Sequence, residues 1–232
     1  MPRDALVLAT RNTGKLAEIS FLLSPLGLPL RRLPVYCPEV EETGETFTEN
    51  ALLKARAAAA ATRRMALADD SGLEVDALNG APGIYSARYG GCAEAAGSRK
   101  PSLRPAPPAD GGNPTGLTQS RDARNREKLL AALAGVPPDR RTARFRCVMA
   151  ACAPDGLHLL AEGVWEGVIA AVPNGGNGFG YDPLFFDPLL GCTAAALSPE
   201  EKNRHSHRSR AAAALLRAWP AFWLSWLARR PG

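Results

Sequence analysis

The sequence predicts an α/β protein, and three observations support this fold class. An apolar run at residues 5–9 (ALVLA) is followed by a polar turn and then by apolar residues at helical spacing. Residues 144–149 alternate between polar and apolar side chains, as a half-buried strand does. Ser198 and Pro199 suit the N-cap and first position of a helix. Strands and helices therefore mix along a chain of 232 residues, which is long enough to bury a substantial core.

In the first part of the chain, a buried strand, a glycine-containing turn and a helix predict half of a βαβ unit. Further on, Thr46 and Glu49 have the spacing of a capping box and stand before an alanine-rich segment. A short apolar stretch then runs into the acidic sequence 69–72, which we interpret as a turn after a strand. The expected elements are a strand at 5–9, a helix over 16–23, a helix over 49–64 and a strand at 65–68.

Residues 92–118 contain five prolines and four glycines and predict an inserted surface loop. Beyond them the spacing of apolar residues, turns and caps predicts a further set of elements. These are a helix over 121–133, strands at 144–149, 157–161 and 163–172, a glycine-rich loop over 173–183 and a final helical region that begins after Ser198. We expect one domain over residues 1–217, with the tail 218–232 outside it.

The tail holds three of the four tryptophans, at 219, 223 and 226. Pro220 is expected to interrupt any helix there, because proline lacks the N–H that the helix needs. We expect the tail to pack against the body of the protein or a second copy. Contact with a membrane surface is the less favoured alternative, because Arg229 and Arg230 alone make a poor basic face.

Charge and cysteine usage exclude several classes of protein. The five cysteines are scattered and form no C-x-x-C pair, which argues against a disulfide framework or a structural zinc site. The first residues lack the organisation of a signal peptide, and no segment is apolar enough to span a membrane. We therefore expect a soluble cytoplasmic protein that works without a membrane. The net charge of +5 is a weak indication of nucleic-acid binding.

Residues 10–15 (TRNTGK) follow the first strand and open a helix. Such a turn presents backbone N–H groups and the positive end of the helix dipole, which suits a phosphate, and Lys15 adds a charge. The segment is not a Walker A loop, because Ala9 stands where a glycine is needed and Leu16 where Ser or Thr is needed. An ordinary helix start with an incidental lysine is the alternative.

Two acidic segments, Glu41–Glu42 and Asp69–Asp70, also predict chemistry. The second pair is expected at the carboxyl end of a strand, where open α/β sheets place their ligands. Carboxylates there could hold Mg²⁺ beside substrate phosphates, and one could act as a general base for water. Solvated acidic turns are the alternative.

The third and fourth candidate segments lie in the second half of the chain. The glycine-rich loop over 175–182 carries Phe179 and Tyr181, whose rings could lie against a nucleobase. The segment 202–208 (KNRHSHR) is either a solvated basic face or, if Ser206 caps a second helix, a first turn that presents His207 and Arg208 to an anion or a carbonyl.

The order of these motifs is more specific than any one of them. Together they resemble the inosine/xanthosine triphosphate pyrophosphatase family, over about residues 4–91 and 119–217. The motifs that carry the resemblance are T-x-N-x-G-K at 10–15, E-E-T-G-x-T-F-x-E-N-A at 41–51, A-D-D-S-G-L at 68–73, G-x-P-G-x-Y-S-A-R-Y at 80–89, G-F-G-Y-D-P at 178–183 and E-K-N…S-H-R at 201–208.

The resemblance implies an elongated mixed β-sheet with helices that form two lobes around a central nucleotide-binding cleft. It also implies a homodimer that cleaves ITP, dITP and XTP to the monophosphate and pyrophosphate with Mg²⁺ as cofactor.

Carried onto this sequence, the resemblance assigns a role to each matching residue. The triphosphate would be held by Thr10, Asn12, Lys15 and Lys54. The metal would be bound by Asp70 and by Glu42 or Glu41. Asp70 would also accept the proton of the attacking water, with Ser71 beside it. Phe179 would stack on the purine in a loop with Gly180 and Tyr181, and the base would be read by Asp182, Lys202, His207 and Arg208.

Two other functions remain open at this point. A nucleic-acid-binding module would show a basic stripe interleaved with aromatic residues, and the aromatic residues here lie apart from most arginines. A related pyrophosphatase could instead act on another modified triphosphate, for example a pyrimidine. Only segments 179–182 and 202–208 would distinguish that enzyme from a purine-specific one.

Overall fold

In the computed structural model, which describes residues 5–91 and 120–229, seven strands form one mixed sheet in the order β2-β1-β3-β4-β5-β6-β7. β1 is parallel to β2 and β3, and every later pairing is antiparallel. Thus the α/β class is confirmed. The strands are β1 (Leu6–Leu8), β2 (Leu30–Arg32), β3 (Ala66–Val75), β4 (Thr142–Cys152), β5 (His158–Ile169), β6 (Phe185–Asp187) and β7 (Cys192–Thr193).

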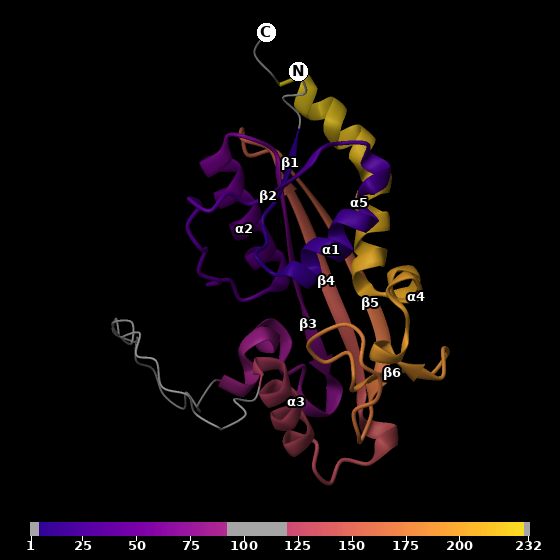
Figure 1. Cartoon of the computed structure of the whole chain (residues 1–232). Helices are drawn as coiled ribbons and strands as arrows, with labels where there is room; N and C mark the ends of the chain where they lie inside the picture. The colour runs from indigo at the N-terminus through magenta and orange to yellow at the C-terminus, as the bar shows by residue number, and fades with distance from the viewer. Residues whose placement is uncertain (1–4, 92–119, 230–232) are drawn as a thin grey trace, which may run out of the picture.

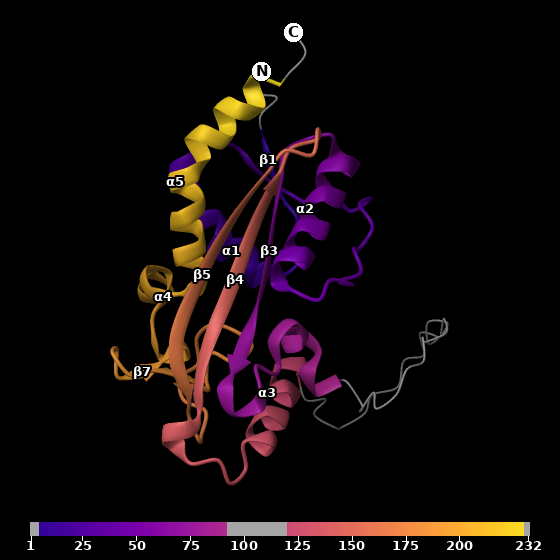
Figure 2. The same cartoon turned by 180° about the vertical axis from the view of Figure 1, so that it is seen from behind.

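Helices cover both faces of the long central strands (Figure 1). α1 and α5 lie on one face and α2 on the other, while α3 lies near the far end of β3, and the reverse view agrees (Figure 2). The helices are α1 (Thr13–Leu22), α2 (Phe47–Thr62), α3 (Arg121–Ala132), α4 (Pro199–His205) and α5 (His207–Leu227), and the 3₁₀ segments include η3 (Gly83–Gly91).

Side chains of β3 alternate between two separate cores. Leu67 packs with α1 and α5, whereas Ala66 and Ala68 pack with α2. This alternation is the ordinary period of a strand. It therefore places Asp69 and Ser71 on the α1/α5 face and Asp70 on the α2 face.

Side-chain caps open these helices: those at Thr46 and Ser198 were expected, that at Ser206 was one of two alternatives, and that at Asn12 was not predicted. The side chains of Asn12, Thr46 and Ser206 each accept a hydrogen bond from a backbone N–H in the first turn that follows. Ser198 and Glu201 form a complete capping box at α4. At α2 the carboxylate of Glu49 accepts from the N–H of Glu45, one residue before the cap, so only the Thr46 half of the expected box is present.

The N-terminus of α5 lies very close to β5, and a glycine permits this. A Cβ at Gly163 would collide with the backbone of His207 and Ala211. The sheet therefore supports the first turn of α5 directly, and with it His207 and Arg208.

Three sequence expectations are wrong. The expected turn at 69–72 is strand, because β3 pairs with β4 without interruption from Ala66 to Val75. The strands expected at 157–161 and 163–172 are the single strand β5, whose ladder to β4 is continuous. α5 also passes through Pro220, since this residue faces solvent while Trp219, Phe222 and Trp226 bury the opposite side in the core.

These aromatic residues confirm the expectation that the end of the chain packs against the body of the protein. The loop expected at 92–118 lies outside the described residues. Within the described part of the chain, none of the helices combines the length and the apolar character that crossing a bilayer requires.

Candidate active site

Two adjoining cavities lie at the centre of the molecule, with volumes of about 660 Å³ and about 200 Å³. The larger is lined by the turn after β1 and by the segment before α2, and the smaller by β3, the loop before β6 and the start of α5. Both are lined by Asn12, Lys15, Glu42, Ala87 and Arg121.

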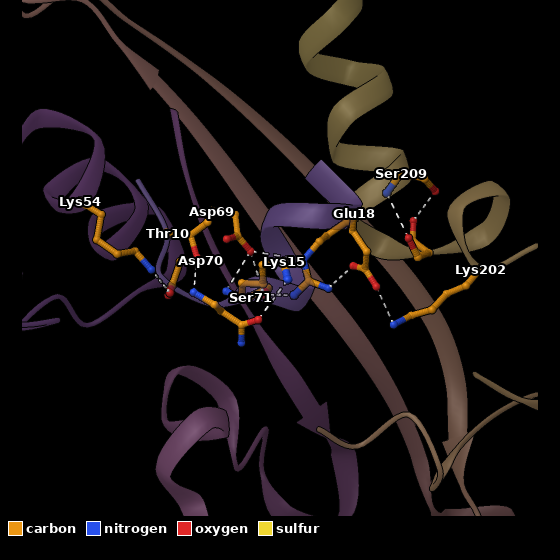
Figure 3. Close-up of polar contacts among 12 residues, drawn as sticks. Thr10, Lys15, Glu18, Lys54, Asp69, Asp70, Ser71, Lys202 and Ser209 are labelled. Atoms are coloured by element: carbon orange, nitrogen blue, oxygen red, sulfur yellow. Dashed lines mark hydrogen bonds and ion pairs between the residues drawn. The ribbon is translucent and has the colours of Figure 1, made fainter. Parts of the chain in front are cut away.

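On the α2 face of β3, the ammonium group of Lys54 lies between the carboxylates of Glu42 and Asp70, and Figure 3 shows its contact with Asp70. Lys54 Nζ donates to Glu42 Oε1 at 2.8 Å and to Asp70 Oδ1 at 2.6 Å. Burial, aided by the charge of Glu42, raises the pKa of Asp70 to about 6 although Lys54 and Lys15 oppose the shift. Asp70 is thus a carboxylate that can exchange a proton near neutral pH.

Glu42 and Glu41 differ in their surroundings. Glu42 is half-buried and accepts hydrogen bonds from Lys54 and from Arg88 Nη1 at 3.2 Å. Burial raises its pKa, but Lys54, Lys15 and Arg88 together outweigh burial and hold that pKa below the ordinary value. Glu41 is exposed and lines only the larger cavity. No three His, Cys, Asp or Glu side chains of the described segments form a ready-made metal site.

On the opposite face, Asp69 is enclosed by cations. Its Oδ2 lies 2.9 Å from Lys15 Nζ and 3.4 Å from Arg208 Nε, and it accepts from Ser71 Oγ at 3.1 Å. Burial raises the pKa of Asp69, but Lys15, Arg208 and Lys54 lower it well below its ordinary range. Within the described residues its Oδ1 has no hydrogen-bond partner. Asp69 therefore remains ionised and orients two cations toward the cavities.

Glu18 of α1 extends this network to Lys202 and Arg208, and its contact with Lys202 is visible in Figure 3. Its two carboxylate oxygens accept from Lys202 Nζ at 2.9 Å and from Arg208 Nη1 at 2.8 Å. Lys202 also donates to Asp182 Oδ2 at 2.6 Å. The cationic groups of Lys202 and Arg208 lie 4.9 Å and 5.2 Å from the ring centre of Phe179. Glu18 thus fixes the spacing of two cations around one aromatic ring.

The loop that carries Phe179 is held from several sides. The N–H of Phe179 donates to Asp182 Oδ2 at 2.9 Å. The N–H of Gly180 donates to Asp122, and its carbonyl accepts from Arg126, both at 2.8 Å and both from α3. Tyr181 is buried and its hydroxyl donates to the Ser86 carbonyl at 2.9 Å. Phe179 therefore lies half-exposed on a rigid loop, while Tyr181 anchors that loop.

His207 and Arg208 occupy the first turn of α5, as the alternative with a cap at Ser206 predicts. The imidazole is buried and stacks on Phe145 at 4.8 Å between ring centres. Burial and the charges of Arg208 and Lys202 hold the pKa of His207 well below its usual range. Its Nδ1 has no partner within the segments described, and the neutral ring lines the smaller cavity. One buried ring nitrogen is thus left without a hydrogen-bond partner among the described residues.

The structure brings the residues expected from the sequence to these two cavities. The larger cavity is lined by Thr10, Asn12, Lys15, Glu41, Glu42 and Lys54. The smaller is lined by Asp70, Ser71, Phe179, Gly180, Tyr181, Asp182, His207 and Arg208. Lys202 lies behind Asp182 and Phe179 and lines neither cavity.

Several functional residues were missed from the sequence. No role was assigned to Glu18, Asp122 or Ser86, and Asp69 was considered only as one of a pair of acids that could hold a metal or act as a base. Glu18 had a detectable signal, because it stands three residues after Lys15 and so shares a helix face with it. The contacts of Asp122 and Ser86 join segments far apart in the chain, which no local pattern reveals.

Known proteins resemble this chain over most of its length. The profile of the Ham1 family matches residues 6–104 and 111–218. A "dITP/XTP pyrophosphatase" from Nitratidesulfovibrio vulgaris is 56% identical over 225 residues, covering 96% of this chain and 99% of that protein. One of the same name from Thioalkalivibrio sulfidiphilus is 50% identical over 214 residues, or 91% of this chain and 96% of that protein.

Solved structures agree with these sequence matches. A HAM1 protein from Coxiella burnetii superposes with a TM-score of 0.75 and is 40% identical, covering 94% of this chain and 99% of that one.

Proposed function

Because the chain belongs to the Ham1 family, we propose that it hydrolyses the non-canonical purine triphosphates ITP, dITP and XTP to the monophosphate and pyrophosphate. Its relatives at 50–56% identity are named for dITP and XTP. The observation that carries the proposal is a cation-lined cavity beside a smaller one that contains Phe179, Arg208 and Asp70. A polyphosphate fits the first cavity and a flat purine the second.

Mg²⁺ is the cofactor that the residues favour. Glu42 and Asp70 already converge on one cation, the ammonium of Lys54, so their oxygens are arranged for a positive charge. Two carboxylates completed by substrate phosphates are the donor set that Mg²⁺ prefers, which explains why no complete protein site is needed. Bound Mg²⁺ would neutralise phosphate charge; Glu42 would hold it with Asp70, while exposed Glu41 would remain outside.

The reaction needs a positioned water and a neutralised polyphosphate. Asp70 accepts a proton from water at its carboxylate as the water oxygen bonds to the α-phosphorus. The bond from that phosphorus to the bridging oxygen breaks, and pyrophosphate leaves. Lys15 and Lys54 stabilise the negative charge, and Thr10 and Asn12 orient the phosphates. A pKa of about 6 in the free protein matches a group that exchanges protons near neutral pH.

Base selection is assigned to the smaller cavity. Arg208 donates to O6 of hypoxanthine or xanthine, and Phe179 stacks on the ring. Adenine presents an amine at that position, so two donors would face each other. One unpaired buried group costs about 1–3 kcal/mol, which is roughly ten- to hundred-fold in kcat/KM. Asp182 and His207 add further contacts that a wrong base cannot satisfy, and Lys202 holds Asp182 and the Phe179 ring in position from behind.

A substrate panel tests the proposal. Pyrophosphate release is measured from ITP, dITP, XTP, GTP, ATP and dUTP, with and without Mg²⁺. We expect rapid release from the first three only, and only with Mg²⁺. Comparable rates on ATP or GTP would refute selectivity for non-canonical purines, and preference for dUTP would favour a pyrimidine enzyme. We also propose a cytoplasmic homodimer without nucleic-acid or membrane partners, and light scattering of the purified protein tests the dimer.

A further inference from the structure

Arg121 is the first residue of α3 and lines both cavities where they adjoin. The other cations of the larger cavity are engaged: Lys15, Lys54 and Arg88 have carboxylate partners, and Arg11 donates to the Cys37 carbonyl. Arg121 has neither a hydrogen bond nor an ion pair to any residue in the described part of the chain. It is therefore a cation at the site whose charge no carboxylate there neutralises.

The position of Arg121 does not favour its own helix. A positive side chain at a helix N-terminus opposes the helix dipole, which favours anions there. α3 already has the two features that stabilise such an end, a cap at Ser120 and an acid at Asp122. Arg121 is thus unfavourable for α3 by itself, and an anion placed in the cavity would reverse the sign of its contribution.

Charge in the larger cavity supports the same conclusion. Its lining includes five cations, namely Arg11, Lys15, Lys54, Arg88 and Arg121, and four carboxylates, namely Glu39, Glu41, Glu42 and Asp69. Without Arg121 these formal charges balance. Arg121 thus gives these described lining residues a net positive charge, which favours a highly charged polyphosphate.

We propose that Arg121 binds the phosphate next to the nucleoside, the one retained in the monophosphate product. It lies with Asn12, Lys15 and Glu42 at the junction of the phosphate and base cavities, where this phosphate connects the two parts of the substrate. Its planar guanidinium can donate two parallel hydrogen bonds to one phosphate. This inference rests on the proposed function and adds a substrate-binding residue to it.

The test uses the full chain and calorimetric titration with dIMP, deoxyinosine and inorganic pyrophosphate, in Mg²⁺. Arg121→Gln should lower the affinity for dIMP about tenfold, which corresponds to the loss of one solvent-screened, charge-assisted contact. The affinities for deoxyinosine and pyrophosphate should stay within about twofold of the wild-type values. The dIMP affinity of Arg121→Lys should lie between those of the wild type and Arg121→Gln, because lysine keeps the charge and loses the two parallel N–H donors of the guanidinium. Arg217→Gln, an exposed arginine of α5 away from both cavities, is the matched control and should bind as the wild type does.

A second readout is turnover of dITP, for which kcat/KM should fall about tenfold in Arg121→Gln. Unchanged dIMP affinity with unchanged turnover would overturn the assignment. So would a loss confined to pyrophosphate, or an equal loss for dIMP and deoxyinosine. If the wild type cleaves dITP while Arg121→Gln behaves like it, only the Arg121 assignment fails. A wild type that neither cleaves dITP nor binds dIMP would overturn the proposed function as well.

Discussion

The two faces of β3 treat adjacent carboxylates in opposite ways. Asp69 faces α1 and α5, where Lys15, Arg208 and Ser71 surround it, and its pKa is lowered. Asp70 faces α2, where it shares Lys54 with Glu42, and its pKa is raised to about 6. Both residues are buried, so burial does not distinguish them. What distinguishes the two carboxylates is the number of cations that each one contacts.

This difference separates a structural anion from a reactive one. An acid with several cationic partners holds those partners in place and keeps its own charge fixed. An acid that must share one cation retains an unfavourable charge, which a proton or a metal ion can relieve. Perturbation of this kind is typical of functional sites. The comparison therefore predicts that Asp70 takes part in the reaction and that Asp69 holds neighbouring cations in place.

The largest expected effect is on turnover in Asp70→Asn. Asparagine keeps the shape and cannot accept a proton from water, so kcat for dITP should fall about 10³-fold, within the usual range for general-base catalysis. Binding of dIMP, measured by calorimetry, should change much less. Asp139→Asn, an exposed acid of the turn before β4, is the control. Turnover within tenfold of the wild type would remove Asp70 from the base role.

The complementary effect is on stability in Asp69→Asn. Loss of this carboxylate leaves Arg208 and Lys15 without their buried partner, and breaking such a pair costs about 3 kcal/mol or more. We expect urea unfolding to show that loss for Asp69→Asn, whereas Asp70→Asn should lose less than about 1 kcal/mol. The opposite ranking would contradict the division between the two faces.

Much of the site could be predicted from the sequence, because its residues come in short motifs at turns and caps. The cap at Ser206, for example, places His207 and Arg208 on the first turn of a helix, and this needs only local rules. Thr46 and Ser198 likewise cap the helices that their spacing predicts. Local hydrogen bonds of this kind depend on neighbours in sequence, which a reader of the sequence can see.

Long-range pairing accounts for what could not be predicted. Asp69 to Gly72 look like a turn, and only the partner strand β4 extends β3 through them. Pro220 should end a helix by propensity, but burial of Trp219 and Phe222 outweighs the one backbone hydrogen bond that proline removes. Glu18 joins Lys202, which is 184 residues away, and no pattern of one segment contains that contact.

A smaller effect is expected for Glu18→Gln. This variant tests how far the charge network on the α1/α5 face of β3 controls the smaller cavity, where the base is proposed to bind. The neutral amide cannot hold both Lys202 and Arg208, so these like charges should separate from their positions beside Phe179. We expect KM for dITP to rise about tenfold, the equivalent of one charge-assisted hydrogen bond, and the preference for dITP over dATP to narrow, with kcat nearly unchanged. Glu200→Gln, exposed at the start of α4, is the control. An equal fall in kcat alone would place Glu18 in the chemical step instead.

The smallest effect distinguishes the two aspartates by pH. For Asp70 the folded pKa, about 6, lies above the ordinary value, so the native state binds the extra proton first and gains stability as pH falls from 7 to 5. The gain is about 1 kcal/mol. For Asp69 the folded pKa is lowered, so its contribution persists over that range and is lost only below about pH 4. The free energy of unfolding is measured with urea in the absence of Mg²⁺. Between pH 7 and 5, the wild type should become more stable relative to Asp70→Asn by about 1 kcal/mol. Its stability relative to Asp69→Asn should not change over that range. Because His207 titrates in all three proteins, its own loss of stability in acid cancels in these differences. Parallel pH profiles for wild type and Asp70→Asn would mean that Asp70 ionises as an ordinary carboxylate, and the contrast between the two faces of β3 would then have no electrostatic basis.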